Sequence, residues 1–198
     1  MDPIRAYFED LSAEWDKQQP ENRNEILTKL VTPHQHLISS SHSILELGSG
    51  TGALSPILSE LSPNASHVSL DLAYKMLLKA KPHKNGNALV ESDVHKLPFL
   101  DNSFDIAICH NCFPHFHNKD FAFQEIQRVL HPDSWLLILH DLSRDEINNI
   151  HKNSPDPIIR DNLIPPIKDM ILYFEACNCN LIQVEDTKDH FSAIGKFP

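Results

Sequence analysis

The spacing of apolar residues along this chain changes between a helical and a strand pattern. Near the amino terminus Tyr7, Leu11 and Trp15 recur at helical spacing, so residues 3–40 are predicted to be mainly helical. Short continuous apolar runs predict strands at residues 43–47, 67–72, 87–93, 104–110, 134–142, 180–186 and 190–197. One helix is predicted after the turn that follows the first strand, through about residue 61. Further helices are predicted at residues 73–81, 119–130, 143–151 and 167–177.

Strand and helix alternate five times before the last two strands form a hairpin. This order predicts an α/β fold with a doubly wound, mostly parallel seven-stranded sheet, an antiparallel last strand and an N-terminal helical extension. At 198 residues the chain is predicted to form one domain. Within it we expect a helical lid at residues 1–40, a cofactor-binding core at 41–142, and C-terminal helices with the hairpin at 143–198.

Composition narrows the classes of partner. The net charge is −10 and is spread along the chain, whereas a nucleic-acid surface needs clustered Lys and Arg, so nucleic acid is not an expected partner. Met1 leads directly into charged sequence, and apolar runs such as residues 135–139 are too short to cross a membrane. The four cysteines then indicate reduced thiols. We expect a cytoplasmic protein without membrane contact, and we consider a homodimer as its oligomeric state.

One short stretch, "ILELGSGTGALS", concentrates the glycines. It holds three of the five in the chain, Gly48, Gly50 and Gly52, between a predicted strand and a predicted helix. Glycine is needed where the backbone takes positive φ or where a ligand approaches it closely. A glycine-rich turn at this place is typical of a nucleotide-binding site. It is not a P-loop, because no Gly-Lys-Ser/Thr follows.

Three acidic residues surround the predicted turn. Asp71 ends the second strand, where a carboxylate accepts hydrogen bonds from the ribose hydroxyls of NAD or of S-adenosylmethionine. Glu46 stands two residues before Gly48, where it would repel a pyrophosphate and favour a ligand with a positive charge. Asp93 ends the third strand and can accept a hydrogen bond from an adenine amino group. Together they favour a nucleoside ligand that is cationic at its reactive end.

Four segments then resemble the successive motifs of class I S-adenosylmethionine-dependent methyltransferases of the Rossmann-like, type 11 kind. They are "ILELGSGTG", "SLDLAYKML", "ESDVHKLPFLDNSFDIAI" and "EIQRVLHPDSWLLI", in order over residues 43–142. Two segments depart from the family pattern. "HPDSW" stands where the family usually has Lys-Pro-Gly-Gly, and "EACNC" where it usually has Ala-Gly-Phe.

The resemblance implies S-adenosylmethionine as cofactor, with S-adenosylhomocysteine as product, and it implies roles for single residues. The loop of Gly48, Ser49, Gly50 and Gly52 would cradle the methionine part. Asp71 would hold the ribose and Leu72 would pack on the adenine, whose amino edge Asp93 and Val94 would contact. The segment from His110 to Phe113 would face the cofactor and the methyl acceptor.

The histidine-rich segment "CHNCFPHFH" supplies the candidates for acceptor chemistry. His110 and His140 end neighbouring predicted strands, and both are candidate general bases. Asn111, Phe113 and His115 are candidate acceptor contacts. The candidate lid residues, which precede the first strand, are Tyr7 and Trp15.

A metal site is the alternative for these side chains, although none is expected. Its ligands would be His110, His115, His140 and His151. The four cysteines, Cys109, Cys112, Cys177 and Cys179, do not have the spacing of a common structural zinc module.

The sequence therefore predicts methyl transfer from S-adenosylmethionine to a small-molecule acceptor, with the accepting atom (N, O or S) left open. Two other functions stay open at this point. One is a metal- or tetrapyrrole-binding protein on the same fold, and the other is an NAD-dependent oxidoreductase.

Overall fold

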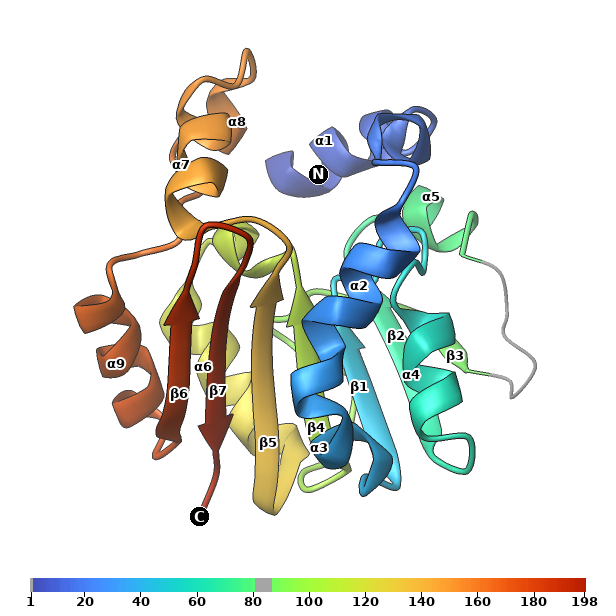
Figure 1. The fold of residues 1–198 in the computed structure, drawn as a ribbon, viewed down its shortest axis with the longest axis vertical. Helices are drawn as coiled ribbons and strands as arrows, with labels where there is room; N and C mark the ends of the chain where they lie inside the picture. Colours follow the sequence, from blue (N-terminus) through green and yellow to red (C-terminus); the bar gives the residue numbers. More distant parts are fainter. Residues whose placement is uncertain (1, 81–86) are drawn as a thin grey trace.

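The computed structural model describes residues 2–80 and 87–198 (Figure 1). Its strands are β1 (Ser43–Leu47), β2 (Ser66–Asp71), β3 (Ala88–Glu91), β4 (Phe104–His110), β5 (Leu130–His140), β6 (Asn180–Asp186) and β7 (Phe191–Lys196). Its α-helices are α1 (Pro3–Leu11), α2 (Arg23–Val31), α3 (Gln35–Ser39), α4 (Ser55–Leu61), α5 (Tyr74–Leu77), α6 (Lys119–Val129), α7 (Arg144–Lys152), α8 (Pro157–Arg160) and α9 (Ile167–Ala176). Short 3-10 helices are η1 (Trp15–Gln18), η2 (Thr32–His34) and η3 (Phe113–His115).

The strands form one seven-stranded sheet in the order β3-β2-β1-β4-β5-β7-β6. Strands β1 to β5 pair in parallel, and β7 pairs antiparallel with both β5 and β6. The predicted fold class is therefore confirmed. The chain builds outward from β1 to β3 and returns to β4 on the other side of β1, so the carboxyl ends of β1 and β4 form the switch point where such sheets bind ligands.

Alternate residues of the central strands face two helical layers. Ile44 of β1 belongs to the cluster that packs under α2, α3 and α4, with Leu27 and Leu58. Leu45 belongs to the other cluster, under α6 and α9, with Phe123 and Phe174. Because α2 and α3 are part of the core, the prediction of a lid over residues 1–40 is too wide. Within residues 2–40, α1 and η1, which we call the cover, lie beyond the carboxyl ends of the strands (Figure 1).

Each of the two segments that depart from the family pattern contains a residue with left-handed backbone. Asp133 has φ +63 and Asn178 has φ +54, and both residue types tolerate this conformation where the family has glycine. The predicted start of the fifth strand at residue 134 is wrong. The strand begins at Leu130, which pairs with Phe104, and Asp133 lies at the irregularity before Trp135 pairs with Ile106.

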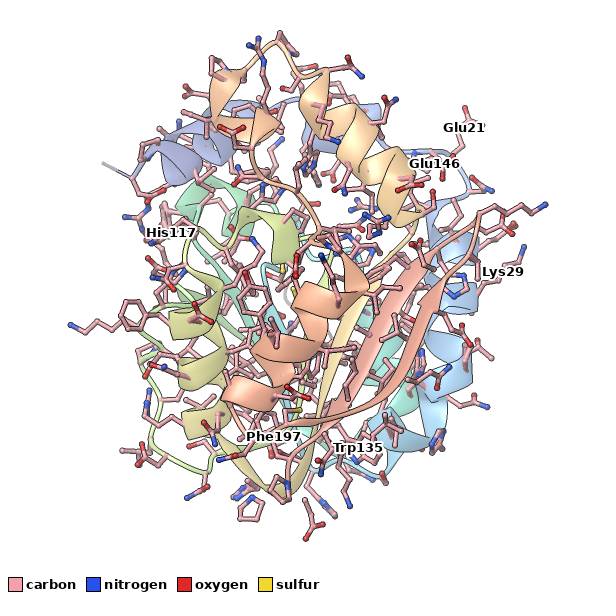
Figure 2. The ribbon with its side chains drawn as sticks, turned by 90° about the vertical axis from the view of Figure 1, so that its left-hand side faces the viewer. Glu21, Lys29, His117, Trp135, Glu146 and Phe197 are labelled. Atoms are coloured by element: carbon pink, nitrogen blue, oxygen red, sulfur yellow. The ribbon has the colours of Figure 1, made fainter. Side chains whose placement is uncertain are left out.

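Helix α7 begins where the capping pattern predicts. The Ser143 hydroxyl accepts a hydrogen bond from Glu146 N at 3.3 Å, and the Glu146 carboxylate accepts one from Ser143 N at 3.3 Å. Trp135 and Phe197 lie at the opposite end of the sheet from α7 (Figure 2).

The helix predicted at residues 73–81 is shorter in the structure, because α5 ends at Leu77. The last residue of that prediction lies outside the described residues.

Candidate functional site

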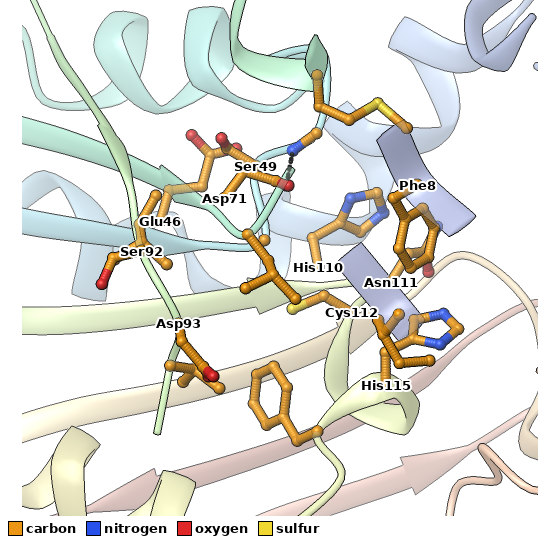
Figure 3. A pocket seen from close by; sticks show the side chains of 18 of the residues that line it. Phe8, Glu46, Ser49, Asp71, Ser92, Asp93, His110, Asn111, Cys112 and His115 are labelled. Atoms are coloured by element: carbon orange, nitrogen blue, oxygen red, sulfur yellow. Dashed lines mark hydrogen bonds between the residues drawn. The ribbon is translucent and has the colours of Figure 1, made fainter. Parts of the chain in front are cut away.

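Two adjoining pockets lie at the carboxyl ends of the parallel strands. We call the first the glycine-loop pocket; its lining includes Gly48, Ser49, Gly50, Asp71, Asp93 and His110 (Figure 3). The second, the outer pocket, lies between the cover and the α7–α8 segment, and its lining includes Tyr7, His140, Leu142, Ile147, His151 and Ile159. Four residues line both pockets: Phe8, Trp15, Asn111 and His115. The pockets therefore share a wall.

The glycine loop follows β1 and has a conformation that other residues rarely adopt. Gly48, Gly50 and Gly52 have φ values of +62, +56 and +79. A Cβ atom at Gly48 would lie 2.5 Å from Cys112 Cβ, so the space beside this glycine is already filled. Ser49 N donates a hydrogen bond of 2.9 Å to the carbonyl of Leu70, which ties the loop to β2. The loop thus presents bare backbone to the pocket.

Asp71 holds the glycine loop and lines the pocket at the same time. Its Oδ2 accepts a hydrogen bond from Gly50 N at 2.7 Å, and its Oδ1 accepts one from Ala73 N at 2.8 Å. Burial raises the pKa of Asp71 to about 6, although these two backbone hydrogen bonds act against the rise. Each carboxylate oxygen keeps a second acceptor site, so Asp71 can still accept a hydrogen bond from a ligand hydroxyl.

Glu46 lines the same pocket but is already engaged by the protein. It is 2% exposed, and its Oε2 accepts hydrogen bonds from Ser55 Oγ at 2.5 Å and Ser69 Oγ at 2.8 Å. His67 Nε2 lies 3.3 Å from the same oxygen. Glu46 therefore belongs to a buried polar network beneath the glycine loop, in addition to facing the pocket.

The far end of the glycine-loop pocket carries the residues expected around an adenine. Leu72, Asp93 and Val94 all line it. Asp93 Oδ1 accepts hydrogen bonds from His95 N at 2.9 Å and from His95 Nδ1 at 2.5 Å. Burial alone would raise the pKa of Asp93, but the hydrogen bonds from His95 outweigh it and lower that pKa. His95, which the sequence analysis did not single out, thus fixes one oxygen of Asp93.

Four buried polar atoms of residues that line this pocket have no hydrogen-bond partner in the structure: Ser49 Oγ, Arg23 Nε, His110 Nε2 and His115 Nδ1. Arg23 is the first residue of α2, and its Nη1 lies 3.5 Å from Asp16 Oδ1. Burial lowers the pKa of Arg23, and Asp16 and Asp141 act against that shift. A free hydroxyl and a free guanidinium N–H beside the bare glycine loop match the carboxylate of a methionine moiety. The residues present therefore fit S-adenosylmethionine. No spacing rule points to Arg23 in the sequence.

The cover is tied down over the glycine-loop pocket by hydrogen bonds and ion pairs. Arg5 Nε donates to the carbonyl of Leu72 at 2.9 Å, and the Arg5 guanidinium pairs with Glu91. Thr51 Oγ1 donates to Asp16 Oδ1 at 2.6 Å. Trp15 Nε1 lies 3.9 Å from where a Cβ atom of Gly50 would be. The predicted position of Trp15 beside the cofactor pocket agrees with this geometry.

The histidines divide between the two pockets. His110 lines the glycine-loop pocket, and its Nε2 lies 3.8 Å from Asp141 Oδ2. His140 is 1% exposed and lines the outer pocket. Burial, together with neighbouring histidine charges, lowers the pKa values of His115 and His140 to about 3, so both rings are neutral near pH 7. His151 Nδ1 contacts the carbonyl of Asn162.

Asn111 and Asp141 join the ends of β4 and β5. Asn111 has φ +53, and its Nδ2 donates to Asp141 Oδ1 at 2.7 Å. Burial alone would raise the pKa of Asp141, but the nearby His110 and Asn111 lower it to about 2. Asp141 was not predicted from the sequence, although it directly follows a strand end at the ligand-binding edge of the sheet.

Phe113 does not contact either pocket, and its prediction as an acceptor contact is wrong. It is 0% exposed and packs edge-on against Phe116 and Phe123 in the core. The 3-10 helix η3 turns Phe113 inward and places His115, two residues later, in the pocket wall.

The metal hypothesis has no geometric counterpart in the part of the chain that the structure describes. Within residues 2–80 and 87–198, no three or more His, Cys, Asp or Glu side chains are grouped as a metal site requires. Cys109 and Cys112 lie together beneath the glycine loop, with Cys112 Sγ 3.1 Å from the carbonyl of Leu47. Cys177 and Cys179 are buried beside Phe174, under α9.

Comparison with known proteins agrees with this geometry. Residues 45–138, from β1 to β5, match the family model described as a methyltransferase domain. The match covers just under half of the chain. The matched residues include the glycine loop, Asp71, Asp93 and His110. Across the described residues, no helix combines the length and the apolar character needed to cross a membrane.

Among the relatives, the malonyl-[acyl-carrier protein] O-methyltransferase of Legionella pneumophila is 30% identical over 118 residues, which are 58% of this chain and 42% of that protein. The demethylmenaquinone methyltransferase of Thermotoga maritima is 32% identical over 96 residues, 48% of this chain and 42% of that protein. The chain thus spans less than half the length of these relatives.

The same fold occurs in solved structures of similar size. A SAM-dependent methyltransferase from Aquifex aeolicus superposes with a TM-score of 0.74 at 19% identity, over 94% of this chain and 98% of that one. One from Thermotoga maritima gives 0.75 at 15% identity, over 98% and 99%. These comparisons support neither the NAD-dependent oxidoreductase nor the metal- or tetrapyrrole-binding protein.

Proposed function

We propose that this chain binds S-adenosylmethionine in the glycine-loop pocket and transfers its methyl group to a small molecule in the outer pocket. The observation that carries the proposal is the pair of unpartnered buried atoms, Ser49 Oγ and Arg23 Nε, beside the bare glycine loop and next to a second pocket. The relatives named for malonyl and demethylmenaquinone methylation support a small acceptor.

The residues of the glycine-loop pocket then have distinct binding tasks. Arg23 and Ser49 bind the carboxylate of the methionine part, Asp71 accepts from the ribose, and the free Oδ2 of Asp93 accepts from the adenine amino group. S-adenosylmethionine, when bound, supplies an electrophilic methyl group on a positively charged sulfur. Phe8 and Trp15, which line both pockets, exclude water from the space between donor and acceptor.

Of the two candidate bases, His110 suits proton removal better than His140. His110 lines the glycine-loop pocket, and its Nε2 lies 3.8 Å from a carboxylate oxygen of Asp141. His140 is fully buried, and its pKa of about 3 makes it a weak base. We assign the base role to His110, with Asp141 as its positioning partner.

The decisive experiment is calorimetric titration of the purified chain with S-adenosylmethionine, S-adenosylhomocysteine and NAD. We expect micromolar binding of the first two and none of NAD. Arg23→Met should weaken both by about tenfold or more, because it removes a charge-assisted hydrogen bond of about 1.5–3 kcal/mol. Lys29→Met is the matched control, since Lys29 is exposed on the same helix. Equal affinities in the two variants would remove Arg23 from the site.

Two further expectations from the sequence stay predictions. The first is a homodimer, which light scattering coupled to size-exclusion chromatography measures directly. The second is a cytoplasmic location, which cell fractionation with an antibody to the chain tests.

A further inference from the structure

The outer pocket has the size of a metabolite site and is mostly apolar. Its volume is about 390 Å³. Aromatic side chains of the cover, among them Tyr7 and Trp15, form one wall, and aliphatic side chains of the α7–α8 segment, among them Ile147 and Ile159, form the facing wall. Such a lining favours a ligand that is largely apolar.

The charges around the outer pocket are unsuited to an anionic acceptor. No Lys or Arg of residues 2–80 and 87–198 lines it, and among these residues its one lining carboxylate is Asp141, whose pKa is about 2. Arg23 lines the glycine-loop pocket instead, where Asp16 pairs with it. A carboxylate in the outer pocket would lose its hydration without gaining a cation, and it would meet the charge of Asp141.

Two buried imidazole nitrogens belong to residues that line the outer pocket. His140 Nε2 and His115 Nδ1 are buried and have no hydrogen-bond partner in the structure. The polar groups of Asn111 are already used, because its Nδ2 donates to Asp141 Oδ1 and its Oδ1 accepts from Asp141 N. A buried nitrogen without a partner costs free energy, which a ligand hydroxyl would recover.

We propose that the outer pocket receives an uncharged, largely apolar acceptor whose hydroxyl group hydrogen-bonds to the free imidazole nitrogens of His115 and His140. This inference rests on the proposed methyl transfer, because it takes the outer pocket as the acceptor site. His115 lines both pockets, so a hydroxyl bound to it lies at the shared wall, beside the donor.

Three probes with the same ring system test the inference: naphthalene, 1-naphthol and 1-naphthoic acid, which is ionised at neutral pH. Their binding to the full chain is measured by ligand-observed NMR in the presence of S-adenosylhomocysteine. We expect 1-naphthol to bind about tenfold or more tightly than 1-naphthoate, because the carboxylate is desolvated without a cation. It should also bind more tightly than naphthalene, by about threefold to tenfold for one hydrogen bond.

Two sets of variants separate recognition from damage to the fold. In His115→Phe and in His140→Phe the ratio of the 1-naphthol and naphthalene affinities should fall toward one, whereas general damage weakens both probes equally. Gln18→Lys puts a cation on the lining of the outer pocket and should favour 1-naphthoate. Gln183→Lys, on the exposed face of β6, is the matched control and should not.

The outcomes distinguish this inference from the proposed function. Failure of S-adenosylhomocysteine to bind would overturn the proposed function. If it binds while 1-naphthoate equals or exceeds 1-naphthol, or none of the probes binds, the acceptor inference is wrong and the cofactor assignment stands. An unchanged 1-naphthol to naphthalene ratio in both histidine variants would likewise overturn the inference.

Discussion

The Asp71 carboxylate, at the end of β2, accepts a 2.7 Å hydrogen bond from Gly50 N in the loop that follows β1. The contact makes one side chain responsible for the shape of the glycine loop and for one wall of its pocket. It also explains why a carboxylate is tolerated at a position that is 9% exposed. Backbone N–H groups replace part of the hydration that burial removes.

The first prediction concerns the dependence of stability on pH. The pKa of Asp71 is raised to about 6 in the folded chain, so folding favours its protonated form. The contribution of this group to stability is therefore present at low pH and is lost as pH rises from about 4 through 6, by about 3 kcal/mol in total. Urea unfolding across this range measures the loss. In Asp71→Asn this pH-dependent loss of stability should be absent. If the free energy of unfolding depends on pH equally in both proteins, the raised pKa does not belong to Asp71.

The buried histidines make the free energy of unfolding depend on pH in the opposite direction. The pKa values of His115 and His140 are lowered to about 3, so folding favours their neutral forms. Their contribution is complete above the unfolded pKa of about 6.5 and falls as pH decreases, by about 2 kcal/mol for each ring at pH 5. His140→Asn should unfold with a shallower acid dependence than the wild type. His36→Asn, on the exposed surface of α3, serves as the control and should keep the wild-type slope.

Gly48→Ala and Gly50→Ala form a matched pair for the glycine loop. Both positions have positive φ, which costs an L-residue about 1–2 kcal/mol. At Gly48 the new Cβ would also lie 2.5 Å from Cys112 Cβ, whereas at Gly50 its nearest neighbour is Trp15 Nε1 at 3.9 Å. We expect Gly48→Ala to lower the free energy of unfolding by about 1–3 kcal/mol more than Gly50→Ala. Equal losses in chemical denaturation would show that the loop moves away from Cys112 without cost.

Arg5 is predicted to hold the cover against the rest of the chain. Arg5→Met removes both the hydrogen bond to Leu72 and the ion pair with Glu91. Amide hydrogen exchange in α1 should accelerate by about fivefold or more, with little change in the sheet. Lys17→Met removes only an exposed pair with Glu14, and exchange there should hardly change. Uniform acceleration throughout the chain would instead indicate global destabilisation.

Local chemistry explains how much of the site could be predicted from the sequence. The glycine loop and Asp71 were found because a turn with positive φ needs glycine, and because a strand end places its next carboxylate at the ligand-binding edge. Asp141 follows the end of β5 in the same way, so it could also have been predicted. Arg23 and His95 could not be predicted in this way. Arg23 matters because its buried Nε has no partner, and His95 because it contacts Asp93, and both facts depend on tertiary packing.

Periodicity and backbone conformation are local properties. The order of strands and helices, the parallel sheet with its antiparallel last strand, and the place of the glycine loop could therefore be predicted from the amino acids alone. Which residues of one loop line a pocket depends on tertiary packing. Phe113 and His115 are two positions apart, yet one packs in the core and the other lines both pockets. It also decided that α2 and α3 belong to the core while α1 and η1 cover the site. The reason is that burial and pocket walls depend on which distant surfaces meet, and a single apolar face has the same pattern whether it packs on a sheet or over a ligand.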